Sequence, residues 1–75
     1  MRRLLMIDDD TKLVALVREY LAPQGFELLA AHDGPSGLEA ARAQEPALVI
    51  LDLMLPGLDG LEVCRRLRAA SAVPC

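Results

Sequence analysis

Aromatic residues are almost missing from this chain of 75 residues, which has one Phe, one Tyr and no Trp. Because 53% of the residues are hydrophobic, the chain is too apolar to be disordered, and its core must be built from aliphatic side chains. The length suits one small domain. A domain of this size buries only about 60% of its unfolded surface, so we expect marginal stability.

Basic charge and long apolar runs are also lacking. With a net charge of −3 the chain has no excess of basic residues that could bind phosphate groups, so we expect no nucleic-acid contact by this chain. No apolar run approaches the ~20 residues of a membrane span. The opening MRRLLMIDDD has two arginines, but the Asp triplet follows only four apolar residues and no small-residue cleavage site is present. A signal peptide is therefore rejected.

Cysteine is scarce as well. Cys64 and Cys75 are the only two, too few for a disulfide framework. Cys64 fits the face of a helix. The presence of only two cysteines favours a reducing, cytoplasmic environment for the protein.

Short apolar segments alternate with segments of helical period. We predict strands over residues 4–7, 26–31 and 47–53 and helices over residues 11–22, 35–44 and 60–69. This alternation indicates a parallel α/β sheet. The third strand, ALVILDL, is apolar at nearly every position, as expected for a strand covered on both faces. Residues 71–75 have no assignable state and could begin a fourth strand.

The helical periods also predict which side chains face the core. In the first helix these are Leu13, Leu16, Val17, Tyr20 and Leu21. In the third helix they are Leu61, Val63, Cys64 and Leu67.

Acidic residues stand at the ends of two predicted strands. Asp8 and Asp9 follow the first strand, and Asp52 lies near the carboxyl end of the third, inside the apolar run LVILDLMLP. Ligand sites of parallel sheets lie at the carboxyl ends of strands, where the winding reverses. If the first strand lies between the second and the third, all three carboxylates meet in one crevice.

Three adjacent carboxylates repel one another, and two solutions are open. One carboxylate can be protonated, or a hard divalent cation can bind. Oxygen ligands without a nearby His or Cys favour Mg²⁺ over Zn²⁺. A carboxylate beside Mg²⁺ and a phosphate is a candidate nucleophile, which would form an aspartyl phosphate.

Other polar residues have simpler interpretations. Asp10 suits a helix cap, and His32, the only histidine, suits a solvated turn. The arginines of the third helix suit an exposed face: Arg65, Arg66 and Arg68. Met54 suits packing, although its carbonyl follows Asp52 by two residues and could face a metal.

The segments MIDDD, HDGPSGLEA and LDLMLPGLDG together resemble the receiver domain of bacterial response regulators, in the branch linked to winged-helix transcription factors. The resemblance spans the whole chain. It implies a flavodoxin-like (CheY-like) parallel sheet with strand order 2-1-3. It also implies two-component signalling rather than an enzyme, with a sensor histidine kinase as partner and Mg²⁺ as cofactor.

The resemblance further implies residue roles. Asp52 is expected to be the phosphoacceptor, Asp9 a direct Mg²⁺ ligand and Asp8 a ligand acting through water. The backbone carbonyl of Met54 is expected to be the third protein ligand. The loop that shapes the site matches Pro56, Gly57, Asp59 and Gly60.

Family members have five βα units, and residues 1–75 match the amino-terminal three, truncated before strands 4 and 5. The family's Ser or Thr on the fourth strand and Lys on the fifth are absent, so we expect an incomplete switch. The third strand would be an open edge and one sheet face would be half covered, so we expect a homodimer or a domain-swapped assembly.

Two alternatives remain. A truncated receiver could act as a dimerisation or assembly module without phosphate signalling. A small Mg²⁺-dependent phosphohydrolase with Asp52 as nucleophile is disfavoured, because such enzymes commonly carry a second Asp two positions on. Met54 occupies that position here, and no substrate-binding cap is present.

Overall fold

The computed structural model describes residues 2–55, 59–70 and 74–75. Strands and helices alternate along the chain, as the sequence predicts. In order they are β1 (Arg2–Ile7), α1 (Thr11–Leu21), a 3-10 turn η1 (Ala22–Gln24), β2 (Phe26–Ala31), α2 (Gly34–Gln44), β3 (Leu48–Leu51) and α3 (Gly60–Ala70). None of these helices is long and apolar enough to cross a membrane.

The three strands form one parallel sheet in the order β2-β1-β3. Leu5 in the central strand lies opposite Leu29 of β2 and Val49 of β3. The strand order 2-1-3 is therefore confirmed. It places the carboxyl ends of β1 and β3 side by side.

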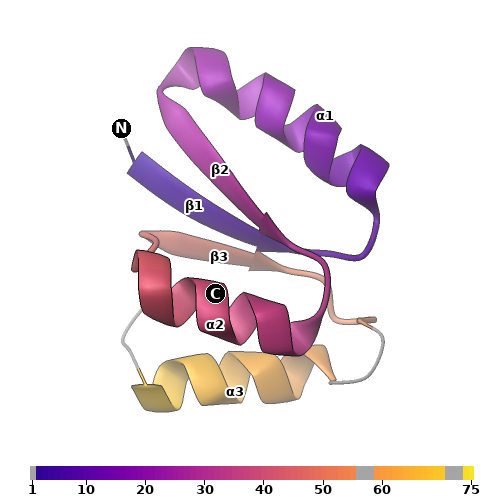
Figure 1. Ribbon diagram of the computed structural model, residues 1–75, viewed down its shortest axis with the longest axis vertical. Coiled ribbons are helices and arrows are strands. Elements are labelled where there is room, and N and C mark those ends of the chain that lie inside the picture. The colour runs from indigo at the N-terminus through magenta and orange to yellow at the C-terminus, as the bar shows by residue number, and fades with distance from the viewer. Residues whose placement is uncertain (1, 56–58, 71–73) are drawn as a thin grey trace.

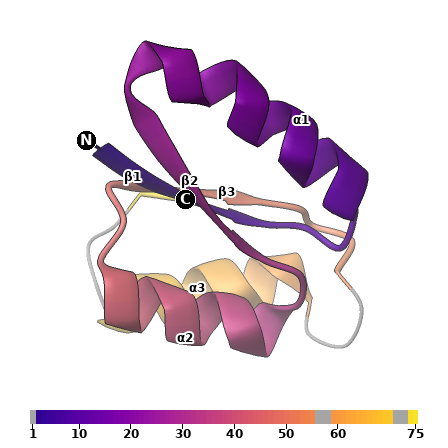
Figure 2. The ribbon, with the colours of Figure 1, turned by 45° about the horizontal axis from the view of Figure 1, so that its top comes forward.

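Helices cover the two faces of the sheet unequally. Figures 1 and 2 show α1 on one face and both α2 and α3 on the other. The core beneath α1 is centred on Leu4, Met6, Val14 and Leu28. The core beneath α2 and α3 is larger and contains Leu5, Ile7, Ala31, Ala41, Val49, Leu55, Val63 and Leu67. Burial of aliphatic side chains in these two layers stabilises the fold.

Aspartate side chains cap the starts of α1 and α2. The Asp10 carboxylate accepts hydrogen bonds from the backbone N–H groups of Lys12 and Leu13, which confirms its expected role. Asp33 caps α2 by accepting from the Ser36 N–H at 2.8 Å. This hydrogen bond lowers the pKa of the Asp33 carboxyl from its ordinary value.

Two details of helix packing differ from the sequence prediction. In α1, Val17 and Leu21 pack against the core as predicted. The buried side chain of this helix is Val14, however, and the predicted Leu13, Leu16 and Tyr20 are 41%, 64% and 70% exposed. The predicted stripe through Leu16 and the observed stripe through Val14 both have helical spacing. In the structure α1 packs Val14 against Leu4, Met6 and Leu28. In α3 Leu61 is 65% exposed, because the inward stripe runs through Gly60, Val63 and Leu67 at positions i, i+3 and i+7.

Strand β3 covers residues 48–51 and is shorter than the predicted 47–53, so Asp52 lies just beyond it. Leu48 is 39% exposed, although its sequence context predicts a strand covered on both faces. Leu48 points to the same face as Ile50, which α1 alone covers, whereas Val49 points to the face under α2 and α3 and is 2% exposed. The outer edge of β3 is not entirely open, because the Val49 N–H donates to the Pro74 carbonyl at 2.9 Å. Residues 71–73, part of the possible fourth strand, lie outside the described residues.

The two cysteines also differ from the expectation of a reduced pair. A disulfide joins Cys64 in α3 to Cys75, with 6.4 Å between their Cα atoms. Sequence separation alone could not indicate this pairing, since it depends on how the chain returns past α3.

Candidate acidic metal site

Backbone pairing continues past the ends of the central and edge strands. The Asp8 N–H donates to the Ala31 carbonyl at 3.0 Å, and the Asp52 N–H donates to the Ile7 carbonyl at 2.9 Å. Both aspartates are therefore fixed by the sheet itself. A carboxylate in the apolar run 48–55 is tolerated because it stands where the strand ends.

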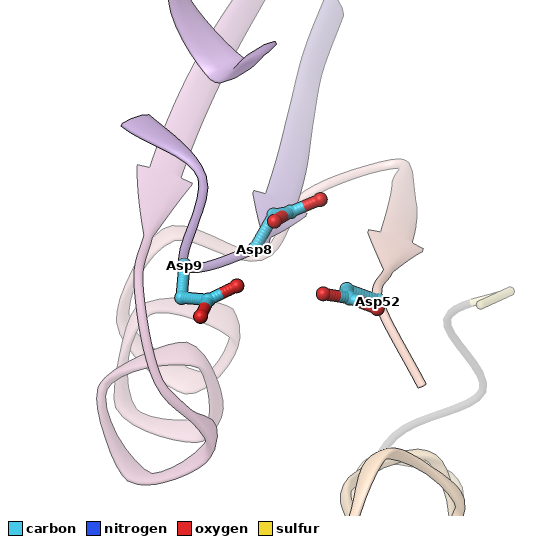
Figure 3. Close-up of side chains that lie close together, drawn as sticks. All are labelled: Asp8, Asp9 and Asp52. Atoms are coloured by element: carbon cyan, nitrogen blue, oxygen red, sulfur yellow. The ribbon is translucent and has the colours of Figure 1, made fainter. Parts of the chain in front are cut away.

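Three carboxyl groups gather at this end of the sheet. One oxygen from each of Asp8, Asp9 and Asp52 lies within 4.8 Å of those of the other two. Figure 3 shows Asp9 and Asp52 pointing toward one another, with Asp8 beside them at the end of β1. Asp8 is only 9% exposed, Asp52 is half-buried and Asp9 is exposed. The predicted convergence of residues 43 positions apart is thus observed.

Local hydrogen bonds hold two of these carboxylates in place. The Asp8 Oδ1 accepts from the Asp10 N–H, and the Asp52 Oδ1 accepts from the Met54 N–H, each at 2.9 Å. Both bonds reach two residues along the chain, as in Asx turns. They orient the carboxylates without neutralising them.

His32 contributes to the site in a way that sequence reasoning missed. Its ring Nδ1 lies 2.9 Å from the Asp8 carbonyl oxygen. Because a carbonyl only accepts, Nδ1 must carry the proton. The histidine is exposed, as expected of a turn, but it also ties the turn after β2 to the backbone of Asp8. No local pattern could have shown this contact across 24 positions.

Gly60 lets α3 begin directly against the backbone that follows Asp52. A Cβ atom built there would lie 2.5 Å from the Leu53 Cα and 2.9 Å from the Asp52 carbonyl oxygen. Neither backbone atom can move aside as a flexible side chain could. Asp59 accepts from the Leu61 N–H at 3.0 Å at the same helix start. The expected loop residues Pro56 and Gly57 lie outside the described residues.

The remaining sequence candidates lie apart from the carboxylates. Arg65 and Arg66 form exposed ion pairs with Glu62 of the same helix, which confirms the solvated face. Met54 is 85% exposed, so the expectation that its side chain packs in the core is wrong. Its backbone N–H, in contrast, contacts Asp52.

The carboxylate cluster fits a small divalent cation. Oxygen ligands on an octahedral Mg²⁺ are about 3 to 4 Å apart, because each lies about 2 Å from the ion. The separation of up to 4.8 Å observed here is slightly wider and needs only small side-chain rotations. The donors are all oxygens, and within the described ranges no His or Cys joins the group. This donor set suits Mg²⁺ better than Zn²⁺.

A parallel sheet of order 2-1-3 with an acidic cluster at the ends of β1 and β3 defines the receiver class of α/β domain. The family model for the response regulator receiver domain matches residues 4–75. The chain therefore belongs to the response regulator receiver domain family.

Relatives of this chain include DNA-binding regulators. Over 73 residues it is 47% identical to the DNA-binding response regulator MtrA of Mycolicibacterium paratuberculosis, covering 97% of this chain and 32% of MtrA. It is 40% identical over 67 residues to the alkaline phosphatase synthesis transcriptional regulatory protein PhoP of Bacillus subtilis, covering 89% of this chain and 28% of PhoP. The chain thus spans about a third of these relatives, whose names agree with the predicted branch of transcription regulators.

Solved receiver structures share the fold. The response regulator TrrA of Thermotoga maritima, in complex with Mg²⁺ and BeF, gives a TM-score of 0.91 at 34% identity, covering 99% of this chain and 64% of TrrA. TrrA in complex with the histidine kinase ThkA gives a TM-score of 0.89 at 35% identity, and the match covers 96% of this chain and 62% of the matched chain. These matches confirm the CheY-like fold and the two-component family.

Proposed function

We propose that residues 1–75 are the amino-terminal portion of a receiver domain in which Asp52 accepts a phosphoryl group from a sensor histidine kinase. The observation that carries this proposal is the convergence of the Asp8, Asp9 and Asp52 oxygens at the ends of two parallel strands. The complex of TrrA with its kinase supports a histidine kinase as phosphodonor. The DNA-binding relatives support an output in transcription. Membership of the receiver domain family supports a cytoplasmic location.

Four groups of this chain would hold Mg²⁺: the carboxylates of Asp8, Asp9 and Asp52 and the backbone carbonyl of Met54. Asp9 and Asp52 would bind directly and Asp8 through water. The Met54 N–H bond to Asp52 supports this assignment, because it keeps the Met54 backbone next to the cluster. When bound, the cation would supply positive charge beside the phosphoryl oxygens.

The protein's own contribution to transfer is positioning. A carboxylate oxygen of Asp52 forms a bond to phosphorus while the bond from phosphorus to the donor histidine nitrogen breaks. The Met54 N–H and the Ile7 carbonyl fix the orientation of Asp52 before the donor arrives. Because the transition state of phosphoryl transfer is loose, positioning of the reacting groups contributes most of the protein's effect on the rate.

We further propose that these residues alone make an incomplete switch. The chain covers 64% of TrrA. The family resemblance implies that the phosphate-contacting Ser or Thr and Lys would belong to the fourth and fifth units. Acceptance of a phosphoryl group by Asp52 needs only the groups described above. Its conversion into a conformational change would need the later units.

The test is phosphorylation by a small phosphodonor. The chain is incubated with Mg²⁺ and acetyl phosphate, and its intact mass is followed. We expect one added phosphoryl group that hydroxylamine removes, as expected for an acyl phosphate. Asp52→Asn should abolish the adduct. Asp10→Asn is the matched control, because Asn caps a helix as well as Asp does and Asp10 lies at the same strand end outside the cluster.

Two outcomes would contradict the proposal. An adduct that persists in Asp52→Asn would place the phosphoryl group elsewhere. The absence of any adduct in the wild-type chain, with Mg²⁺ binding intact, would favour the assembly role.

That second candidate, self-association, is favoured by one observation. Apolar side chains on α1 are exposed to different extents: Leu13 to 41%, Leu16 to 64% and Tyr20 to 70%. Contacts of such side chains between copies would remove apolar surface from water. Sedimentation of the wild type should show a dimer or larger species, and Leu16→Glu should shift it toward monomer. A monodisperse wild-type monomer would contradict this candidate.

A further inference from the structure

Strand β2 lies at an edge of the sheet. Within the described residues it pairs with β1 alone, and Figure 1 shows α1 running alongside it. In sheets of this fold further strands are added beyond β3, in the order 2-1-3-4-5, so β2 remains an edge in a longer chain as well. An edge strand presents a row of backbone N–H and C=O groups that another strand can pair with.

The hydrogen bonds of the sheet show which backbone groups of β2 face outward. The Ala31 carbonyl accepts from the Asp8 N–H, so Ala31 turns its backbone groups toward β1. Successive residues of a strand turn these groups to opposite sides. The outward-facing residues of β2 are therefore Phe26, Leu28 and Ala30.

A side chain from α1 occupies one of these outward-facing groups. The Arg18 Nε donates to the Leu28 carbonyl at 3.2 Å. Arg18 lies in the last turn of α1, and its side chain therefore reaches around the edge of the sheet to the middle of β2. A strand that approached this edge would have to displace the guanidinium group and bury or move its charge.

The composition of β2 favours pairing with another strand. Its sequence, FELLAA, contains one charged residue and neither Pro nor Gly. Segments of about six residues with little charge and no Pro pair readily with a second copy when their edge is open. The one charged residue, Glu27, forms an ion pair with Arg3 of β1 at 3.4 Å, which reduces its repulsion of another copy. Protection of this edge must therefore come from outside β2.

We propose that Arg18 guards the outer edge of β2 against pairing with the same edge of a second copy. Two identical edges would pair in antiparallel fashion about a twofold axis. Because Leu28 is near the middle of β2, this axis would pass close to it, and the two Arg18 guanidinium groups would meet there. Like charges in that position oppose the pairing. This role is separate from phosphoryl transfer, because Arg18 lies outside the acidic cluster.

The experiment replaces Arg18 by methionine, which keeps an apolar stem and removes both the charge and the hydrogen-bond donor. Sedimentation velocity at increasing protein concentration measures association, and amide hydrogen exchange at single-residue resolution locates the contact. We expect Arg18→Met to associate more strongly than the wild type. In the associated sample the amides of Leu28 and Ala30 should exchange about tenfold or more slowly than in the dilute sample. The amide of Leu29, which faces β1, should change far less.

Two variants serve as controls. Arg18→Lys keeps the positive charge and a donor, and it should associate no more than the wild type. Lys12→Met makes the same exchange of a cation for methionine in the first turn of α1, and it should also behave like the wild type. The amide of Leu5, in the central strand, reports whether each variant is folded. If Arg18→Met is not folded, Arg18→Leu takes its place, because Leu favours a helix and cannot donate.

Three results would overturn the proposal. Equal association of Arg18→Met and the wild type would show that Arg18 does not guard the edge. Association that slows exchange at Leu28 and Ala30 no more than at Leu29 would place the contact elsewhere. Association of Lys12→Met as strong as that of Arg18→Met would show that an added apolar side chain on α1 is the cause.

Discussion

Replacement of Gly60 by alanine tests whether the start of α3 shapes the acidic site. The new Cβ would lie 2.5 Å from the Leu53 Cα and 2.9 Å from the Asp52 carbonyl oxygen, so α3 or the backbone at residues 52–53 must shift. Overpacking of this kind costs about 1 to 3 kcal/mol, and the better helix propensity of Ala returns at most about 1 kcal/mol. We therefore expect a net loss of about 1 to 2 kcal/mol in unfolding free energy. A chain of 75 residues is stable by roughly 4 to 11 kcal/mol, so Gly60→Ala should still fold.

The same shift should weaken the metal site. Displacement of the backbone at Asp52 moves its carboxylate, and loss of such support typically lowers metal affinity about tenfold or more. Urea unfolding measures the stability, and calorimetric titration measures Mg²⁺ affinity.

The matched control is Gly25→Ala. Gly25 has φ of +88° with nothing within 4 Å of a built Cβ, and it lies in the turn before β2. Its replacement should cost about 1 to 2 kcal/mol through backbone strain alone and leave Mg²⁺ affinity unchanged. If both variants lose stability but bind Mg²⁺ equally well, the close approach of α3 does not shape the site and the reasoning fails.

Three further predictions follow from the packing and the caps. Val63→Ala should lower the unfolding free energy by about 2 kcal/mol because Val63 is fully buried. Leu61→Ala should change it by less than about 0.5 kcal/mol because Leu61 is exposed. Equal losses in urea unfolding would contradict the assigned face of α3. The lowered pKa of Asp33 means that its stabilising cap is fully present above its ordinary value of 3.8 and is lost as the pH falls through the lowered pKa. Asp33→Asn should therefore show a shallower acid-unfolding curve than the wild type, and identical curves would be inconsistent with the cap. His32→Ala should weaken Mg²⁺ binding by up to about tenfold, because the Asp8 carbonyl loses its hydrogen-bond donor. His32→Asn should restore part of the affinity. If Mg²⁺ titration gives the same affinity for His32→Ala as for the wild type, the histidine does not support the site.

Much of the fold follows from local patterns in the sequence. The switch between apolar runs and helical periods predicts the three strands and the three α-helices that the structure describes, because each pattern reflects burial on a sheet face or on one helix side. The meeting of Asp9 and Asp52 follows from a rule of parallel sheets, since both lie at carboxyl ends of neighbouring strands. That part of the site therefore needs no knowledge of side-chain contacts.

The features that sequence reasoning missed depend on contacts between distant segments. Two apolar stripes run along α1, and only packing against the sheet decides that Val14 is buried and Leu16 is exposed. The bond from His32 to the backbone of Asp8 joins two turns that no local pattern relates. The pairing of Cys64 with Cys75 likewise requires the chain to return to the edge of β3.

The central claim is that three aspartates share one divalent cation. A crystal structure of the chain with Mn²⁺, which scatters anomalously and shares the oxygen preference of Mg²⁺, tests it most directly. We predict one anomalous peak about 2 Å from carboxylate oxygens of Asp9 and Asp52, with Asp8 next to it. Full occupancy by Mn²⁺ at another position, with the oxygens of this cluster bound only to water, would contradict the account.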